Sequence, residues 1–322
     1  MKIKMNKLKN KKLITIGIPC FNEEKNVLEM YKETKKVIDK INGYDFDFLF
    51  VDNGSIDKTR EKINILIKKD KNVRGVFLSK NFGNEASGLA LMDFVDNHAD
   101  AFIMLPCDLQ DPPGLIPKLI RQWENGYEIV LAQYNKINDS IFMTFMRKTF
   151  YLFFKKISNI DVPINVSGFG LMDKKVLKAI TSLPEKFRFG RGLSIWVGFK
   201  RTYINYERVE RQRGKSSYSF FDYVRHSERG VFGFSYLPLD LIVYFGFILT
   251  ILSFLFIIGY LFTVIFFGNP INASIPIMLA IVFFGGVQLL AISIIGKYIQ
   301  VIVEETKNRP VYIVDEKINF KD

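Results

Sequence analysis

LITIGIPCFNEE, residues 13–24, joins a short apolar run to a polar cluster and decides the fold. The apolar part, 13–18, predicts a β-strand, because nearly continuous apolar runs are typical of strands buried on both faces. Further strand-like runs are 47–51, 73–79, 101–105 and 128–132, and helix-like segments are 23–41, 57–69, 85–98 and 115–124. This alternation predicts an α/β fold with a parallel sheet that is covered by helices on both faces.

Polar clusters follow three of the predicted strands. They span 19–24, 52–57 and 108–113, and each alone could be a plain turn or helix cap. In parallel sheets, ligands bind at the carboxyl ends of the strands. Three acidic clusters there suit a nucleoside bound by carboxylates and a diphosphate neutralised by a divalent cation. The chain lacks GxGxxG and GxxxxGK[ST] loops, which argues against a dinucleotide-binding fold or a P-loop kinase.

Two long uncharged runs, 241–267 and 271–296, stand near the C-terminus. Each exceeds the roughly 20 residues that a helix needs to cross a bilayer. Only Gly268, Asn269 and Pro270 separate them, so we expect an antiparallel transmembrane hairpin. The alternative is a pair of helices buried in a large soluble core.

The basic residues predict an orientation. The turn of the hairpin has no Lys or Arg, whereas its flanks carry Arg225, Arg229, Lys297, Lys307 and Arg309. The excess of Lys and Arg on cytoplasmic loops therefore puts both flanks, the N-terminal domain and both termini in the cytoplasm. The formal net charge of +12 then suits a membrane surface and phosphate-bearing substrates, and no nucleic acid partner is expected.

Several smaller segments carry weaker signals. Residues 1–12 are basic and lack the apolar core of a signal peptide. Segments 140–157 and 220–236 mix aromatic and basic residues, which favours helices in the headgroup plane over core-facing helices. NRPVYIV, 308–314, is expected to dock on the N-terminal domain as an extended segment. Cys20 and Cys107 are expected to be small buried residues, since their spacing fits no metal or redox motif.

Seven features occur in a specific order: IPCFNEE, VDNGSIDKT, LSKNFGNEAS, CDLQDPP, RFGRGLSIWVGF, RQRGKSSYS and the closing hairpin. With them the sequence resembles the polyprenyl-phosphate glycosyltransferases, which include bactoprenol glucosyltransferases and dolichol-phosphate mannose synthases. These are family-2 glycosyltransferases of the GT-A fold, and the resemblance covers about 12–315. It implies a Rossmann-like GT-A catalytic domain with amphipathic interfacial helices and a two-helix transmembrane hairpin. The expected segments are a basic arm at 1–12, the GT-A domain at 13–216, a juxtamembrane helix at 217–237, spans at 239–267 and 271–299 within 238–303, and a cytoplasmic tail at 304–322.

The resemblance also implies an activity. It is the inverting transfer of a hexose from a nucleotide-sugar, expected to be a UDP-sugar, to polyprenyl (undecaprenyl) phosphate at the cytoplasmic membrane face. Mg²⁺ or Mn²⁺ is the implied cofactor, and a homo-oligomer, of which a tetramer is one form, the implied assembly. The implied nucleotide-sugar site is Pro19, Asn22, Glu23, Asp52, Asn53, Ser55, Asp57 and Asp108.

The remaining implied roles concern the reaction centre. Asp108 and Gln110 are the expected metal site. The expected catalytic residues are Asp108, Asp111, Arg211 and Lys215, with Asp111 as the candidate base. The acceptor phosphate is expected to contact Lys136, Ser140, Arg211, Arg213, Lys215 and Ser216.

The chain departs from the family pattern at several places. Pro106 and Asn53 stand where relatives carry aspartates, and Tyr134, Asn135 and Gly170 stand where an arginine is usual. These departures predict a weaker or water-mediated metal site and an altered grip on the acceptor phosphate. They also leave open a non-catalytic scaffold that binds nucleotide-sugars. A processive polysaccharide synthase is a further alternative, but it would need more spans and a QxxRW motif.

Overall fold

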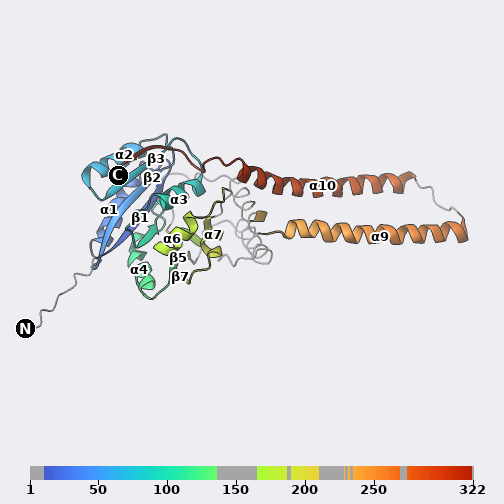
Figure 1. Cartoon of the computed structure of the whole chain (residues 1–322), viewed down its shortest axis with the longest axis horizontal. Helices are drawn as coiled ribbons and strands as arrows, with labels where there is room; N and C mark the ends of the chain where they lie inside the picture. The colour runs from blue at the N-terminus through green and yellow to red at the C-terminus, as the bar shows by residue number, and fades with distance from the viewer. Residues whose placement is uncertain are drawn as a thin grey trace, which may run out of the picture.

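The computed structural model describes residues 11–135, 165–186, 190–209, 228, 231–232, 235–268 and 274–320. The N-terminal part is an α/β domain, and two long helices, α9 and α10, project from it (Figure 1).

The described strands form one mixed sheet in the order β7-β5-β6-β4-β1-β2-β3-β8. Their bounds are β1 Lys12–Cys20, β2 Tyr44–Asp52, β3 Val73–Leu78, β4 Ala101–Met104, β5 Ile129–Tyr134, β6 Val166–Asp173, β7 Arg201–Tyr206 and β8 Val314–Ile318. The first four strands are parallel, as the alternating pattern predicts. Strands β5 and β7 run in the same direction as these four. The expectation of a wholly parallel sheet is wrong only for β6, which runs antiparallel between β4 and β5, and for β8, which runs antiparallel to β3.

Strand β6 fits into the sheet partly through Gly170. A Cβ atom at Gly170 would lie 2.8 Å from the Val130 carbonyl oxygen of the neighbouring strand β5. Real Cβ atoms do not approach a backbone atom so closely, so the present backbone leaves no room for a side chain. Glycine at this position is therefore a packing requirement of this sheet.

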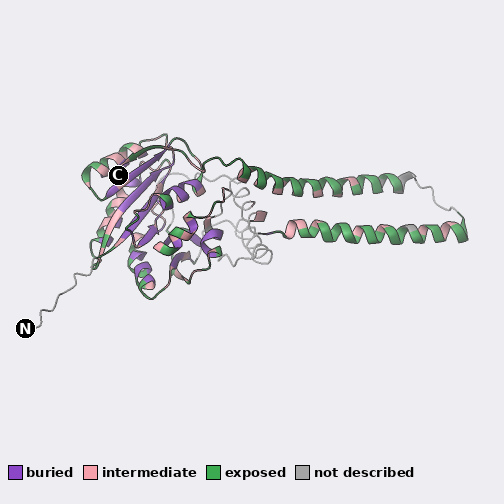
Figure 2. Ribbon diagram, in the orientation of Figure 1, coloured by how far each residue is buried: buried purple, intermediate pink, exposed green. Residues whose placement is uncertain are grey.

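Helices cover both faces of the sheet, as expected. They are α1 Val27–Ile38, α2 Thr59–Lys69, α3 Asn84–Asp93, α4 Ile116–Glu124 with a preceding 3₁₀ turn at Pro113–Leu115, α6 Lys174–Thr181 and α7 Gly190–Trp196. Side chains alternate between faces along a strand. On β2, Phe48 and Phe50 therefore pack in one core with α1, α2 and α4, and Leu49 and Val51 pack in the other with α3 and α6. Figure 2 shows these buried layers inside the domain.

Helices α9, Leu237–Phe267, and α10, Ser274–Thr306, are long and apolar enough to cross a membrane. The most apolar stretch of each has none of its residues buried, which is unlike a core helix of a soluble protein. Figure 2 shows both helices exposed along their length. The second helix begins three residues later and ends seven residues later than the expected span of 271–299.

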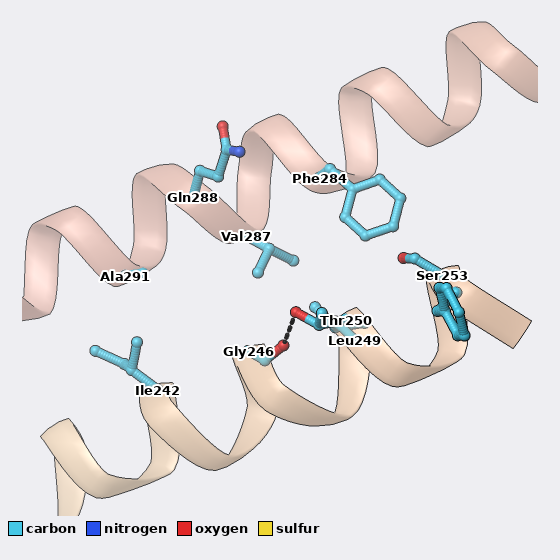
Figure 3. A pocket seen from close by; sticks show the side chains of 10 residues that line it. Ile242, Gly246, Leu249, Thr250, Ser253, Phe284, Val287, Gln288 and Ala291 are labelled. Carbon is cyan, nitrogen blue, oxygen red and sulfur yellow. Dashed lines mark hydrogen bonds between the residues drawn. The ribbon is translucent and has the colours of Figure 1, made fainter. Parts of the chain in front are cut away.

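A groove of about 550 Å³ lies between α9 and α10. Its lining is mostly apolar, and Thr250 donates a hydrogen bond to the Gly246 carbonyl at 2.8 Å within α9 (Figure 3). The groove belongs to the hairpin and lies outside the α/β domain, so it does not form part of the acidic edge described below.

The C-terminal tail returns to the α/β domain and adds strand β8 to the sheet. The Ser79 amide donates to the Ile313 carbonyl at 3.0 Å, so the expected docking of the tail is confirmed. Arg60 of α2 pairs with Asp315 at 2.8 Å and with Glu316 at 2.5 Å. The tail thus ties the domain-side end of α10 to β3 and to α2, and β8 becomes the edge strand of the sheet.

Candidate functional site

The first part of the site lies where β1 and β2 end side by side. Cys20 is in register with Asp52, and the Asn53 amide donates to the Cys20 carbonyl at 2.9 Å. The Asp52 side chain is buried, and its Oδ1 accepts hydrogen bonds from the backbone amide and the hydroxyl of Ser55. Burial raises the pKa of Asp52 above its ordinary value, and the two bonds from Ser55 oppose that shift.

The loop after β1 is locked onto the loop after β2 by side-chain hydrogen bonds. The Asn22 amide donates to Ser55 Oγ at 2.9 Å, and the Ile56 amide donates back to Asn22 Oδ1 at 3.0 Å. The Glu23 amide donates to Thr59 Oγ1 at 2.8 Å. Pro19 precedes this loop on β1, in register with Val51. Four of the residues predicted to bind the nucleotide-sugar therefore lie together here, namely Pro19, Asn22, Glu23 and Ser55.

Asp57 supports the same two loops. Its Oδ1 accepts from the Thr59 amide at 2.9 Å at the start of α2, and its Oδ2 accepts from the Glu24 amide at 3.2 Å. An acidic side chain that binds free amides at a helix start is stabilising. Both carboxylate oxygens of Asp57 thus hold backbone in place.

Asn53 is engaged by a third loop. Its Nδ2 donates to Asn81 Oδ1 at 3.0 Å and to the Gly83 carbonyl at 3.1 Å, and its Oδ1 accepts from the Phe82 amide at 3.0 Å. An aspartate could not donate the first two bonds. The asparagine at this position therefore suits the loop that it holds.

The second part of the site is an acidic pair after β4 that faces the end of β7. Asp111 is completely buried and accepts a hydrogen bond from the Tyr206 hydroxyl. Arg208, two residues beyond β7, faces both carboxylates: its Nε lies 3.4 Å from Asp111 Oδ1 and its Nη2 lies 3.8 Å from Asp108 Oδ2. The Asp108 side chain is 18% exposed. We call Asp108 and Asp111 the acidic pair, and Tyr206 and Arg208 its cap.

Electrostatics within this group follow from burial. Burial raises the pKa of Asp111, and Arg208 and the Tyr206 hydroxyl act in the opposite direction. Burial alone would lower the pKa of Arg208, but the carboxylates of Asp111 and Asp108 outweigh it and raise that pKa. The guanidinium therefore carries its charge at any physiological pH.

The two parts of the site meet through the cysteines. Cys20 ends β1 and Cys107 immediately precedes Asp108, and both are buried free thiols, as expected. Burial and then the contact with the Cys107 thiol raise the pKa of Cys20. These thiols are therefore packing groups that join the Asp52 side of the edge to the Asp108 side.

The residues present fit a divalent cation that is held by one protein carboxylate and mainly by substrate phosphates. Among the described residues no three His, Cys, Asp or Glu side chains are grouped to hold a metal ion. Asp111 has no exposed surface, and Gln110 Nε2 donates to the Val209 carbonyl at 3.4 Å. Asp108 remains as a partly exposed carboxylate. Mg²⁺ keeps several waters and commonly takes one or two protein carboxylates together with substrate phosphates, which this arrangement can provide.

Several predicted site residues lie outside the described residues, namely Lys136, Ser140, Arg211, Arg213, Lys215 and Ser216. The segment 140–157, expected to be an interfacial helix, and most of the segment 217–237, expected to be a juxtamembrane helix, lie there as well. Sequence reasoning missed Arg208 and Tyr206. A basic residue two positions after the strand 201–206 was an available signal, of the same kind as the acidic residues after β2 and β4.

The mixed sheet and its acidic carboxyl edge can now be compared with known proteins. The sequence profile of glycosyl transferase family 2 matches residues 15–181, and the chain belongs to this family. It is therefore a glycosyltransferase of GT-A-like fold.

The relatives span almost the whole chain. The Bacillus subtilis protein CsbB, named as a glycosyltransferase, is 36% identical over 94% of this chain and 92% of its own length. The bactoprenol glucosyl transferase of Shigella phage SfX is 34% identical over 94% and 99%. Glucosyl-3-phosphoglycerate synthase from Mycobacterium tuberculosis, solved with Mn²⁺, UDP and phosphoglyceric acid, has a TM-score of 0.47 at 16% identity and covers 67% of this chain and 75% of its own.

Proposed function

We propose that this chain transfers one hexose from a nucleotide-sugar, expected to be a UDP-sugar, to polyprenyl phosphate, with inversion at the anomeric carbon. The acceptor is undecaprenyl phosphate at the cytoplasmic face of the membrane. The observation that carries the proposal is one acidic carboxyl edge joined to two helices of membrane-spanning length. The name of the phage relative, which matches nearly the whole chain, supports the lipid acceptor.

The reaction asks little of a general base. An oxygen of the acceptor phosphate attacks the anomeric carbon, the bond from that carbon to the donor diphosphate breaks, and the nucleoside diphosphate leaves with the electron pair. A phosphate monoester has its second pKa at about 6, so the attacking oxygen is largely ionised near neutral pH. Asp111 has no exposed surface, which favours a role in positioning Tyr206 and Arg208 over the role of base.

The donor would span the two parts of the edge. Asp52 would accept a hydrogen bond from the base, in a loop that Asn22, Glu23 and Ser55 hold rigid. Asp108, with water or Gln110, would hold Mg²⁺ or Mn²⁺ beside the diphosphate. Such an ion stabilises charge on a departing phosphate oxygen. Asp52 ends β2 and Asp108 follows β4, on either side of β1, so the two carboxylates can contact separate parts of one donor.

Contacts between the hairpin and the domain support transfer close to the membrane surface. Glu305, near the end of α10, accepts the Lys186 amide at 2.8 and 2.9 Å. Near the start of α9, the Ser235 carbonyl accepts from the Tyr298 hydroxyl at 2.7 Å. The first contact fixes the end of α10 to the domain, and the second joins α10 to the segment just before α9. Both ends of the hairpin are therefore held together on the domain side, where a lipid phosphate would present its charge. Lys136, Ser140, Arg211, Arg213, Lys215 and Ser216 are the proposed contacts to that phosphate, and a homo-oligomer is the proposed assembly.

The test uses purified full-length protein in detergent with undecaprenyl phosphate and a panel of labelled nucleotide-sugars. We expect a glycolipid product, and we expect Asp108→Asn to abolish its formation. Asp45→Asn is the matched control, because Asp45 lies near the opposite end of β2 and is exposed in a pair with Lys11. Nucleotide binding without transfer from any donor would instead favour the non-catalytic scaffold.

A further inference from the structure

Arg208 is held in place on two sides at the carboxyl edge. Strand β7 runs parallel to β5 with Tyr206 opposite Tyr134, so both strands end at the same edge. The Arg208 guanidinium lies over the Tyr134 ring, 5.6 Å from its centre. The next residue, Val209, donates its amide to the Gln110 carbonyl at 3.3 Å and accepts from Gln110 Nε2 at 3.4 Å. These bonds fix the backbone beside Arg208, so its side chain reaches the acidic pair from a defined position.

The charges of this group do not balance. When both are ionised, Asp108 and Asp111 contribute two negative charges, and Arg208 contributes one positive charge facing both. Asp111 is completely buried and needs a permanent counter-ion, since an unpaired buried carboxylate is strongly unfavourable. Asp108 is partly exposed and lies at the longer distance of 3.8 Å from the guanidinium. The pair with Asp108 is therefore the one that another cation can replace.

Arg208 also has unused hydrogen-bonding capacity. Its Nε is buried without a hydrogen-bond partner, although it lies 3.4 Å from Asp111 Oδ1, and its side chain remains 27% exposed. A guanidinium has five N–H donors in a planar fork that suits phosphate oxygens. A group so placed, beside the carboxylate proposed to hold the cation, can bind the anion that the cation accompanies.

We propose that Arg208 is a diphosphate-binding residue of the donor site, which pairs with Asp108 in the empty site and turns to the donor diphosphate when the donor binds. The inference rests on the proposed function. It gives the donor diphosphate a second positive partner, Arg208, in addition to the divalent cation that Asp108 would hold. It has a specific consequence: a nucleoside diphosphate binds this chain even without a divalent cation, through Arg208. It also gives Asp108 opposite effects with and without metal, because Asp108 competes for Arg208 and recruits the cation.

The test measures binding of UDP, GDP and uridine to the full-length protein in detergent by calorimetry, in EDTA and in Mg²⁺. We expect wild type to bind a nucleoside diphosphate in EDTA, and Arg208→Gln to weaken that binding at least about tenfold. Uridine affinity should not change. Arg208→Lys should give an intermediate loss, because it keeps the charge but loses the fork.

Two further variants separate binding from folding. Arg74→Gln is the matched control, because Arg74 pairs at 2.5 Å with the mostly buried Asp47 near the start of β3, away from the carboxyl edge. It should keep the wild-type diphosphate affinity. Asp108→Asn should bind the diphosphate in EDTA at least as tightly as wild type and should lose the gain that Mg²⁺ gives.

The inference is overturned if Arg208→Gln and Arg208→Lys bind the diphosphate like wild type in EDTA. It is equally overturned if Arg208→Gln loses diphosphate and uridine binding alike, or if Asp108→Asn weakens metal-free binding. If wild type binds no nucleoside diphosphate and transfers no sugar, both the inference on Arg208 and the proposed function fail. Sugar transfer by wild type with unchanged binding in Arg208→Gln would refute the role of Arg208 alone.

Discussion

Gly54 offers the sharpest test of how the nucleoside side of the edge is built. It has a positive φ of 67°, and a Cβ atom there would collide with the Lys80 backbone and lie 2.7 Å from the Asn81 amide nitrogen. A left-handed conformation costs a residue with a Cβ about 1–2 kcal/mol, and forced overpacking typically costs a further 1–3 kcal/mol. Gly54→Ala should therefore destabilise the α/β domain by about 2–5 kcal/mol.

Gly43→Ala is the matched control for this prediction. Gly43 also has a positive φ, 92°, but nothing lies within 4 Å of a Cβ atom at that position. This variant should lose only the conformational part, about 1–2 kcal/mol. In a domain of this size each kcal/mol lowers the melting temperature by about 2–4 °C, which scanning fluorimetry in detergent resolves.

Ligand binding adds a second measurement for the same pair of variants. Gly54→Ala displaces the loop that carries Asp52 and Asn53 against Asn81, so it should also weaken UDP binding in the folded protein. Gly43→Ala should leave UDP binding unchanged. Equal melting temperatures and equal affinities for the two variants would refute the reasoning, because the backbone contact at Lys80 would then have no effect.

Two further predictions concern Asp52 and the C-terminal tail. Burial raises the pKa of Asp52, so nucleoside affinity should be lost as the pH falls through a value above the ordinary pKa of an aspartate. Asp52→Asn should remove this pH dependence in binding titrations. The effect on stability has the opposite sign, because a carboxyl whose pKa is raised in the folded state stabilises the fold at low pH and loses that contribution as the pH rises. Arg60→Ala removes two solvent-screened ion pairs to Asp315 and Glu316, which should cost about 1 kcal/mol and speed proteolysis of the tail, whereas Lys36→Ala, which breaks an exposed pair to Glu33, should not affect the tail.

Local patterns were sufficient for much of the fold. The apolar runs 13–18 and 47–51 lie inside β1 and β2, because strands buried on both faces need continuous apolar sequence. The helices were placed correctly but begin later than expected after the first two strands. Residues 22–26 and 57–58 instead form loops. The amides of residues 22–24 bond to Ser55, Thr59 and Asp57, and the Lys58 amide bonds to the Glu24 side chain.

Long-range pairing limited the rest of the prediction. Strand β6 was not expected, because its sequence contains Gly168 and Gly170 and its place between β4 and β5 depends on partners far along the chain. The acidic pair with its cap is similar, since Tyr206 and Asp111 are 95 residues apart. No local spacing indicates such a contact. The resemblance to known glycosyltransferases identified the aspartates, but the cap became visible only with the structure.

The central claim is that the acidic edge transfers a sugar to a lipid phosphate beside the membrane. The most direct test is mass spectrometry of the lipid after incubation of full-length protein with a UDP-hexose, a divalent cation and undecaprenyl phosphate. The account predicts one new lipid species, heavier than the acceptor by a single hexose residue. A ladder of several hexoses would indicate a processive synthase, and unchanged lipid with every donor tested would contradict the claim.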